Sequence, residues 1–244
     1  MQNFQSFLTE SKQEGGGLTI FDIDETLFQT TAKIAVTKNG KVVKELTNQE
    51  YNTYKLKTGE EFDFGQFKSA EKFNKESKVI PRMMAKFKAI LKNVMNKPNS
   101  RVIIITARAD FDNKKLFLDT FRKHGVDIDN VYVERAGNLG NNPSAENKMK
   151  IIRKYLDHGK FSRVRLFDDA MSNLKALIDL KKEYPDVTFA AYLAHENGSI
   201  TTIKEEQEFV SKAGAGEWGR PELVANYIKD TPGQSLKKFK NYVK

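Results

Sequence analysis

Two aspartates stand two positions apart at the end of an apolar run, in the segment LTIFDIDETLF over residues 18–28. Because an extended backbone places alternate side chains on the same side, Asp22 and Asp24 can converge where this strand ends. Crowded carboxylates repel each other, so we expect a cation or a shared proton between them. The pair suits metal-assisted nucleophilic attack and favours an enzyme that acts on phosphate groups.

Two later apolar runs also end in polar side chains. The run 102–105 is followed by Thr106, and the short strand expected over 164–167 is followed by Asp168 and Asp169. In parallel sheets, ligands bind at the carboxyl ends of the strands. The sequence therefore predicts that these side chains gather near the first aspartate pair.

A lysine between the second and third runs completes the set. Lys148 lies in a helix expected over 145–156, which leads into the strand at 164–167. Phosphoryl transfer requires a nucleophile, an acid or base, a magnesium held by oxygens, and donors for the phosphoryl oxygens. Hard oxygen ligands favour Mg²⁺ over zinc, so Mg²⁺ is the expected cofactor.

In this order, the segments resemble the motifs of the haloacid dehalogenase (HAD) superfamily of phosphohydrolases, in its Asp-x-Asp-x-Thr phosphatase branch. The first motif is matched at 22–26, and the second, an apolar strand ending in Thr or Ser, at 103–106. The third, a helix-borne lysine, is matched best by Lys148, with Lys150 in reserve. The fourth, a strand ending in an acidic pair, is matched at 166–169. The resemblance covers about residues 18–195.

The resemblance implies a role for each member of the first aspartate pair. Asp22 would be the nucleophile and would form an aspartyl-phosphate. Asp24 would protonate the leaving oxygen and would then activate water as a base. Family members with an aspartate at this second position are typically phosphatases or phosphotransferases.

The resemblance also implies a metal site and a phosphate site. Asp22, Asp168 and the backbone carbonyl of Asp24 would hold Mg²⁺, and Asp169 would ligate it directly or through water. Thr106 and Lys148 would hold the phosphoryl oxygens. All four aspartates, with Thr106 and Lys148, are thus the predicted site.

Two positions leave alternatives open. Arg108, two residues after Thr106, could contact a substrate phosphate or could form a structural ion pair; the spacing favours neither. Glu25 stands where glycine is commonest in the family. Because glutamate occurs there in some branches, it puts the subfamily in doubt but not the chemistry.

Strand and helix patterns alternate from 81 to 195, which predicts an α/β fold: a Rossmann-like parallel sheet with helices on both faces. Asn39-Gly40 between two β-prone runs predicts a hairpin within a small cap at about 29–80. The expected helices are 81–95, 114–124, 145–156 and 173–183. The expected strands are 18–21, 102–105, 131–133, 164–167 and 187–193.

The predicted organisation has three parts. Residues 1–17 form a leader that ends in a Gly15–Gly17 hinge, 18–199 form the HAD-like core, and 200–244 form an extension with short helices near 202–212 and 221–229. The leader could be a loosely docked terminus. Its Phe-x-x-Phe-Leu-x-Glu pattern also resembles the cleavable targeting peptides of tailed-phage internal head proteins.

Composition narrows the class of protein. The 244 residues carry 41 basic and 32 acidic side chains, a formal charge of +9, which favours anionic partners such as nucleotides, nucleic-acid ends or phosphorylated metabolites. With no cysteine, thiolate zinc sites and cysteine nucleophiles are excluded. No apolar span is long enough for a membrane helix. We expect a cytoplasmic protein, in the host cytoplasm or virion if of phage origin; the sequence does not give its oligomeric state.

Two functions remain in competition. The first is a Mg²⁺-dependent phosphatase that hydrolyses a phosphomonoester. The second is a nucleic-acid-binding or phage-head-associated protein that uses the HAD fold as a scaffold. No P-loop, dinucleotide glycine pattern or Gly-x-Ser-x-Gly elbow occurs, which disfavours a kinase or a serine hydrolase.

Overall fold

The computed structural model describes residues 15–203, apart from 52, 98, 141 and 160. Six strands form the main sheet in the order β11-β10-β9-β1-β7-β8. The pairs β10–β9, β9–β1, β1–β7 and β7–β8 are all parallel, which confirms the predicted α/β fold with its parallel sheet. The strands are β1 (Gly16–Phe21), β7 (Arg101–Thr106), β8 (Tyr132–Arg135), β9 (Phe161–Asp168), β10 (Thr188–Ala194) and β11 (Ile200–Ile203).

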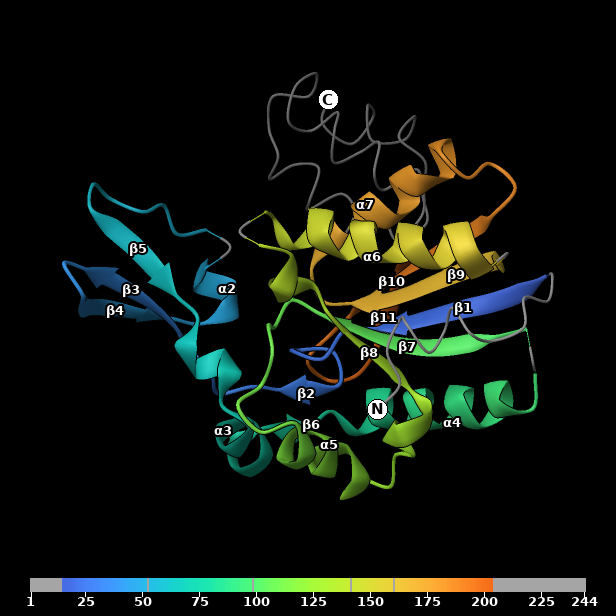
Figure 1. Ribbon diagram of the computed structural model, residues 1–244, viewed down its shortest axis with the longest axis horizontal. Coiled ribbons are helices and arrows are strands. Elements are labelled where there is room, and N and C mark those ends of the chain that lie inside the picture. Colours follow the sequence, from blue (N-terminus) through green and yellow to red (C-terminus); the bar gives the residue numbers. More distant parts are fainter. Residues whose placement is uncertain (1–14, 52, 98, 141, 160, 204–244) are drawn as a thin grey trace, which may run out of the picture. The chain divides into compact units, whose positions relative to one another are not determined.

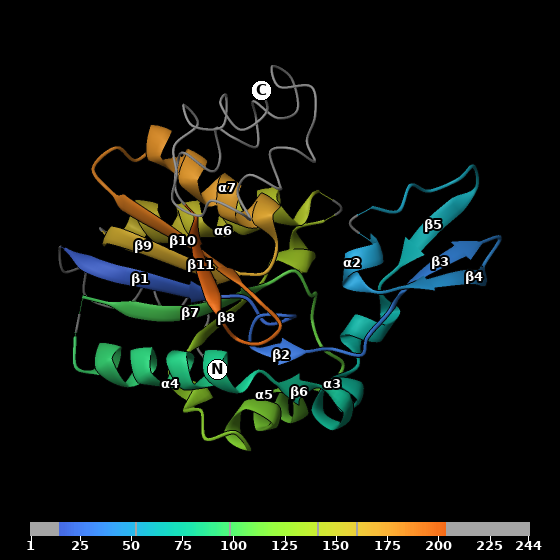
Figure 2. The same cartoon turned by 180° about the vertical axis from the view of Figure 1, so that it is seen from behind.

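Helices cover both faces of this sheet, as Figures 1 and 2 show. On one face lie α6 and α7, and on the other lie α4 and α5. Their bounds are α4 (Pro81–Met95), α5 (Lys114–Arg122), α6 (Ser144–Gly159) and α7 (Met171–Asp179). Each of the four follows a predicted helical pattern, with Pro81 at the start of α4, where its fixed φ suits a helix and its missing N–H costs nothing.

Strand β1 lies in the middle of the sheet, and its side chains form part of the core. Leu18, Ile20 and Phe21 are fully buried, because the strand is covered on both faces. The Phe21 ring stacks on Phe167 of β9 with centroids 4.5 Å apart and meets Phe87 of α4 edge to face. These contacts fix the carboxyl end of β1 beside that of β9.

The glycine run differs from the expected hinge. Gly16 and Gly17 are the first residues of β1, and they pair with Phe161 and Arg163 of β9. A Cβ atom on Gly16 would lie 1.3 Å from the carbonyl oxygen of Asn99, so the close approach of two backbones requires glycine here. The first fourteen residues of the predicted leader lie outside the described part of the chain.

The segment expected to form a cap contains two differently packed parts. The first is a three-stranded antiparallel sheet in the order β4-β3-β5, named here the cap sheet: β3 (Ile34–Lys38), β4 (Lys41–Leu46) and β5 (Glu60–Asp63). Asn39 and Gly40 both have positive φ, 51° and 72°, as a type I′ hairpin turn requires. The cap sheet has an apolar cluster of its own: Ala32, Ile34, Val36, Leu46 and Phe67.

The second part belongs to the main core. Helix α3 (Ala70–Glu76) packs against α5, and its Phe73 ring lies 5.5 Å from that of Phe117. The remaining elements of the segment are short: α2 (Asn48–Tyr51), the 3-10 turn η1 (Gly65–Lys68), and the paired strands β2 (Phe28–Gln29) and β6 (Lys78–Val79). The chain thus leaves the core after β2 and returns to it at α3.

The chain divides into two units after Ile200, and the site described below lies wholly in the first. Residues 202 and 203, where a helix was expected to begin, are in strand β11. The rest of the expected C-terminal helices lies outside the described residues. None of the described helices combines the length and apolar character that crossing a membrane requires.

Candidate functional site

Three carboxylates come together at the carboxyl ends of β1 and β9. Phe21 pairs with Phe167, so Asp22, which follows β1, lies beside Asp168, the last residue of β9. Oxygens of Asp22, Asp168 and Asp169 all lie within 4.8 Å of one another. Asp22 and Asp168 are buried, with 5% and 0% of their surface exposed. The pairing register of two neighbouring strands therefore creates a concentrated negative site.

Lys148 points into this site from α6. Its Nζ lies 2.7 Å from Asp168 Oδ2 and 3.0 Å from Asp22 Oδ1, and its side chain is 1% exposed. Lys150, the reserve lysine, instead pairs with Glu146 on the outside of the same helix at 2.7 Å. The structure therefore brings Lys148, and not Lys150, to the carboxylates.

The acids outnumber the base, and their pKa values reflect this. Burial raises the pKa of Asp22 to about 7, with Asp168 and Asp24 adding repulsion and Lys148 opposing it. Burial and the charges of Asp168 and Asp22 raise the pKa of Asp169 to about 8. Burial disfavours the charged form of Lys148, but the attraction of Asp168 and Asp22 outweighs it and raises the pKa of that amine.

The other oxygen of Asp168 is held by α7. Its Oδ1 accepts hydrogen bonds from the backbone N–H of Ala170 at 2.9 Å and from Asn173 Nδ2 at 2.8 Å. Asn173 was missed by the sequence analysis, because a polar residue in an amphipathic helix is usually solvated. It is 3% exposed, and it fixes the orientation of a carboxylate that also binds Lys148.

Thr106 is the last residue of β7, the strand on the other side of β1. Its side chain is fully buried, and its hydroxyl accepts a hydrogen bond of 3.1 Å from the backbone N–H of Arg108. The sheet thus places Thr106 on a strand next to the one that carries Asp22.

Asp24 turns away from the three carboxylates and pairs with Arg108. The Arg108 guanidinium contacts both oxygens of Asp24, at 2.6 Å from Nη2 to Oδ1 and at 2.9 Å from Nε to Oδ2. Of the two alternatives for Arg108, the structure shows the ion pair. The side chain of Asp24 is outside the three-acid group, which leaves its backbone carbonyl as its predicted metal ligand.

Glu25 adopts the conformation that makes glycine common at this position. Its φ is 55°, in the left-handed region. Two hydrogen bonds stabilise the turn: the Glu25 N–H donates to the Phe28 carbonyl at 2.8 Å, and Glu25 Oε1 accepts from the Thr30 N–H at 3.1 Å. Glu25 therefore adopts a left-handed conformation without being glycine, and its side-chain contact with Thr30, at the start of the cap segment, stabilises that conformation.

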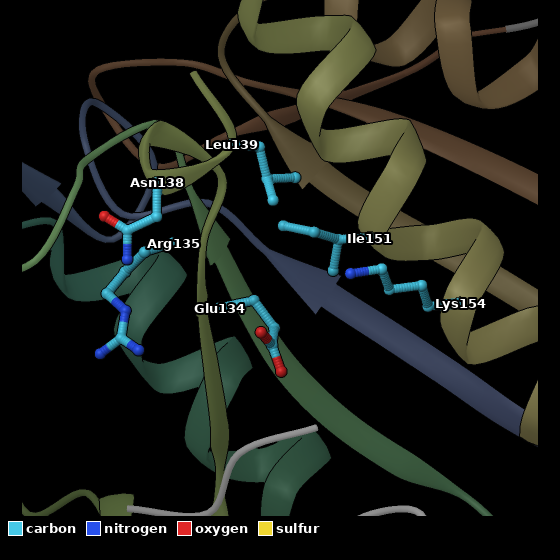
Figure 3. Close-up of a pocket in the computed structure, with 6 residues that line it drawn as sticks. All are labelled: Glu134, Arg135, Asn138, Leu139, Ile151 and Lys154. Carbon is cyan, nitrogen blue, oxygen red and sulfur yellow. The ribbon is translucent and has the colours of Figure 1, made fainter. Parts of the chain in front are cut away.

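The chain also has a pocket of about 170 Å³ between β8 and α6, shown in Figure 3. None of the predicted site residues lines it. The lining residues are Glu134, Arg135, Asn138, Leu139, Ile151 and Lys154. Glu134 already accepts a hydrogen bond from Tyr155, and Arg135 lies 3.0 Å from Asp110, so these charges are largely satisfied.

The three-carboxylate site fits a divalent cation. All its donors are oxygens, which Mg²⁺ prefers, and one lysine offsets three acids. Burial, together with repulsion from the neighbouring acids, raises the pKa values of Asp22 and Asp169, so their charged forms have a deficit of positive charge around them. A second cation bound by Asp22, Asp168 and Asp169 would remove that deficit.

No protein-family model and no curated protein matches the chain. Among solved structures, the chain is similar to the HAD domain of effector protein Lem4 from Legionella pneumophila, with 13% sequence identity and a TM-score of 0.43. The similarity covers 82% of this chain and 94% of that one. At this level of similarity no residue role passes from that domain to this chain, and the chemistry must follow from the site itself.

Proposed function

We propose that this chain is a Mg²⁺-dependent phosphatase that hydrolyses a phosphomonoester through an aspartyl-phosphate on Asp22. The observation that supports this most strongly is the meeting of three carboxylates with the buried amine of Lys148 at neighbouring strand ends. Oxygen ligands, a nucleophilic carboxylate and a fixed cation are the parts that phosphoryl transfer requires.

In the first half of the reaction, a carboxylate oxygen of Asp22 attacks the phosphorus atom, and the bond to the ester oxygen breaks. The protonated form of Asp24 gives its proton to the departing oxygen, which leaves as an alcohol, and the resulting carboxylate is the form that pairs with Arg108. In the second half, Asp24 takes a proton from water, and the resulting hydroxide attacks the phosphorus. Asp22 is released, and inorganic phosphate leaves.

Lys148 and Thr106 would hold the phosphoryl oxygens during both steps. Lys148 keeps its positive charge, because Asp22 and Asp168 raise its pKa despite its burial. Asn173 would act indirectly by fixing Asp168. Mg²⁺, held by Asp22, Asp168 and Asp169, would neutralise the charge of the phosphoryl oxygens as the nucleophile approaches.

For the substrate, we propose an anionic phosphomonoester such as a nucleotide, a nucleic-acid end or a phosphorylated metabolite. The formal charge of +9 would attract each of these. A screen of nucleotides, oligonucleotides with 3′- or 5′-phosphates and sugar phosphates would separate them. Strong preference for one class would identify the physiological chemistry.

The direct test is release of phosphate from an aryl phosphate in the presence of Mg²⁺. Asp22→Asn should lower kcat by about 10⁴-fold or more, because an amide does not attack phosphorus. The variant should stay folded, since it removes one of three repelling charges. Asp186→Asn, at an exposed position, is the matched control and should keep full activity. Turnover retained in Asp22→Asn, or undiminished by EDTA, would overturn the proposal.

A further inference from the structure

Arg108 is the second buried cation near the reacting groups, and its surroundings differ from those of a substrate-binding arginine. Its side chain is 1% exposed. Three rings surround the guanidinium, those of Phe67, Phe73 and Phe111, with centroids 4.8, 5.0 and 5.5 Å from its central carbon. The charge of Arg108 is therefore enclosed by aromatic rings.

The donors of the guanidinium are also occupied. Nε and one Nη2 hydrogen bind Asp24, the second Nη2 hydrogen reaches Thr30 Oγ1 at 3.0 Å, and Nη1 donates to the Phe67 carbonyl at 2.9 Å. An arginine has five N–H donors, and these contacts use four of them. Little capacity remains for a phosphate group.

The partners of Arg108 come from three parts of the chain. Asp24 follows β1 of the main sheet, Thr30 lies where the chain leaves the core, and Phe67 belongs to the apolar cluster of the cap sheet. Arg108 itself follows β7. A single planar group therefore links the position of the cap sheet to the orientation of Asp24.

Building on the phosphatase proposal above, we propose that Arg108 is a positioning residue that holds Asp24 in place through its contacts with Thr30 and the Phe67 carbonyl. A carboxylate held by two donors of a rigid fork has one orientation, whereas a single flexible contact would leave it free to rotate. The cap segment thus takes part in catalysis by fixing the residue that exchanges protons with the leaving group and with water.

The consequence for catalysis depends on the leaving group. An alkoxide is strongly basic and must receive a proton as it departs, whereas a nitrophenolate leaves without one. Asp24 also activates water in the second half, which both substrates share, so the difference appears in the first half, which kcat/KM reports. Misplacing Asp24 should therefore lower kcat/KM for an alkyl phosphate much more than kcat/KM for p-nitrophenyl phosphate. A residue that binds the phosphoryl group would affect both substrates alike.

The experiment compares Arg108→Lys with wild type on these two substrates. Lysine keeps the charge but has no planar fork, so it cannot hold Asp24 and the Phe67 carbonyl in the same geometry. We expect kcat/KM for the alkyl phosphate to fall by about 10²-fold or more and kcat/KM for p-nitrophenyl phosphate by less than about tenfold. Arg122→Lys, which alters an exposed arginine paired with Asp119 and Asp129, is the control.

A double-mutant cycle shows whether Arg108 acts through Asp24. If it does, adding Arg108→Lys to Asp24→Asn should lower kcat/KM for the alkyl phosphate no further. Independent, multiplying losses would mean that Arg108 acts on something other than Asp24, and the inference would be wrong. Equal losses of kcat/KM on both substrates, or unchanged kinetics, would also overturn it.

A milder variant keeps the question open to test if Arg108→Lys does not fold. Thr30→Val removes one partner of the guanidinium and leaves the ion pair with Asp24, so we expect a loss of about three- to tenfold on the alkyl phosphate alone. Thr31→Val is its neighbour control, because Thr31 bonds to Glu76 at the surface. A wild-type protein that hydrolyses neither substrate would instead refute the phosphatase proposal itself, a result distinct from any outcome with the variants.

Discussion

Two buried cations, Lys148 and Arg108, differ in the number of carboxylates that each must neutralise. Lys148 offsets three acids, two of which have pKa values raised to about 7 and 8. Arg108 pairs with one acid, Asp24, and uses its other donors on neutral oxygens. The first centre, named here the unbalanced centre, consists of Lys148, Asp22, Asp168 and Asp169; it lacks positive charge and can accept a further cation. The second, the balanced centre, consists of Arg108 and Asp24; its charges are paired, and it holds the structure around it.

The difference also appears in how each cation is enclosed. Lys148 extends from helix α6 to the carboxyl ends of β1 and β9, where its amine contacts two carboxylates. Arg108 lies among aromatic rings contributed by the cap cluster and the main core. Burial alone therefore does not identify a reactive residue; the ratio of charges around it is more informative.

The largest predicted effect follows from removing the cation of the unbalanced centre. Lys148→Met should lower the free energy of unfolding by about 3 kcal/mol or more at pH 7, because it leaves buried carboxylates without a partner. Lys150→Met removes only an exposed pair with Glu146 and should cost less than about 0.5 kcal/mol. Urea denaturation of both variants measures the contrast. Equal stability losses would mean that Lys148 does not balance the three acids.

The sequence contained the information that separates these two lysines. Lys148 shares a helix face with Ile151, Ile152 and Tyr155, all of them buried, whereas Lys150 lies off that face. The periodicity of apolar residues could therefore have selected Lys148 without reference to any family. The carboxylates were predictable for a similar reason, since each follows an apolar run that had to be a buried strand.

Other features depend on contacts that no local pattern records. Asn173 reaches Asp168 because α7 packs beside β9, and the helix pattern around it predicts only a polar position. The pairing of Arg108 depends on a carbonyl of Phe67, forty-one residues earlier in the chain. The need for glycine at position 16 likewise depends on the approach of the Asn99 backbone. In the sequence, this glycine could not be told from one in a flexible hinge.

The next prediction adds a cation instead of removing one. Mg²⁺ at a hundred times its dissociation constant should raise the free energy of unfolding by about 2.7 kcal/mol, measured as a rise in Tm. Asp168→Asn should abolish that rise, because Asp168 is a proposed ligand in the unbalanced centre. Arg108→Lys should retain it, because Arg108 binds the side chain of Asp24, whereas the proposed ligand is the backbone carbonyl of that residue. A rise that survives in Asp168→Asn would place the cation elsewhere.

The smallest effect, and the one that depends most directly on charge balance, is the response of the magnesium-free protein to pH. In the unfolded chain Asp22 titrates near its usual pKa of 3.8, but in the folded chain burial and repulsion raise its pKa to about 7. Between these values the folded state holds more protons than the unfolded state, so stability falls as the pH rises. The slope should approach about 1.4 kcal/mol per pH unit for this group, and chemical denaturation at several pH values measures it.

Comparing two variants shows which of the two centres causes this pH dependence of stability. Asp22→Asn removes a titrating group of the unbalanced centre and should flatten the slope, whereas Arg108→Lys should leave it as in wild type. Saturating Mg²⁺ should also flatten it, because the bound ion replaces the protons that the carboxylates would otherwise retain. Stability that rises with pH between about 4 and 7 would have the opposite sign. It would show that the three acids are already balanced in the folded protein, and the distinction between the two centres would then be wrong.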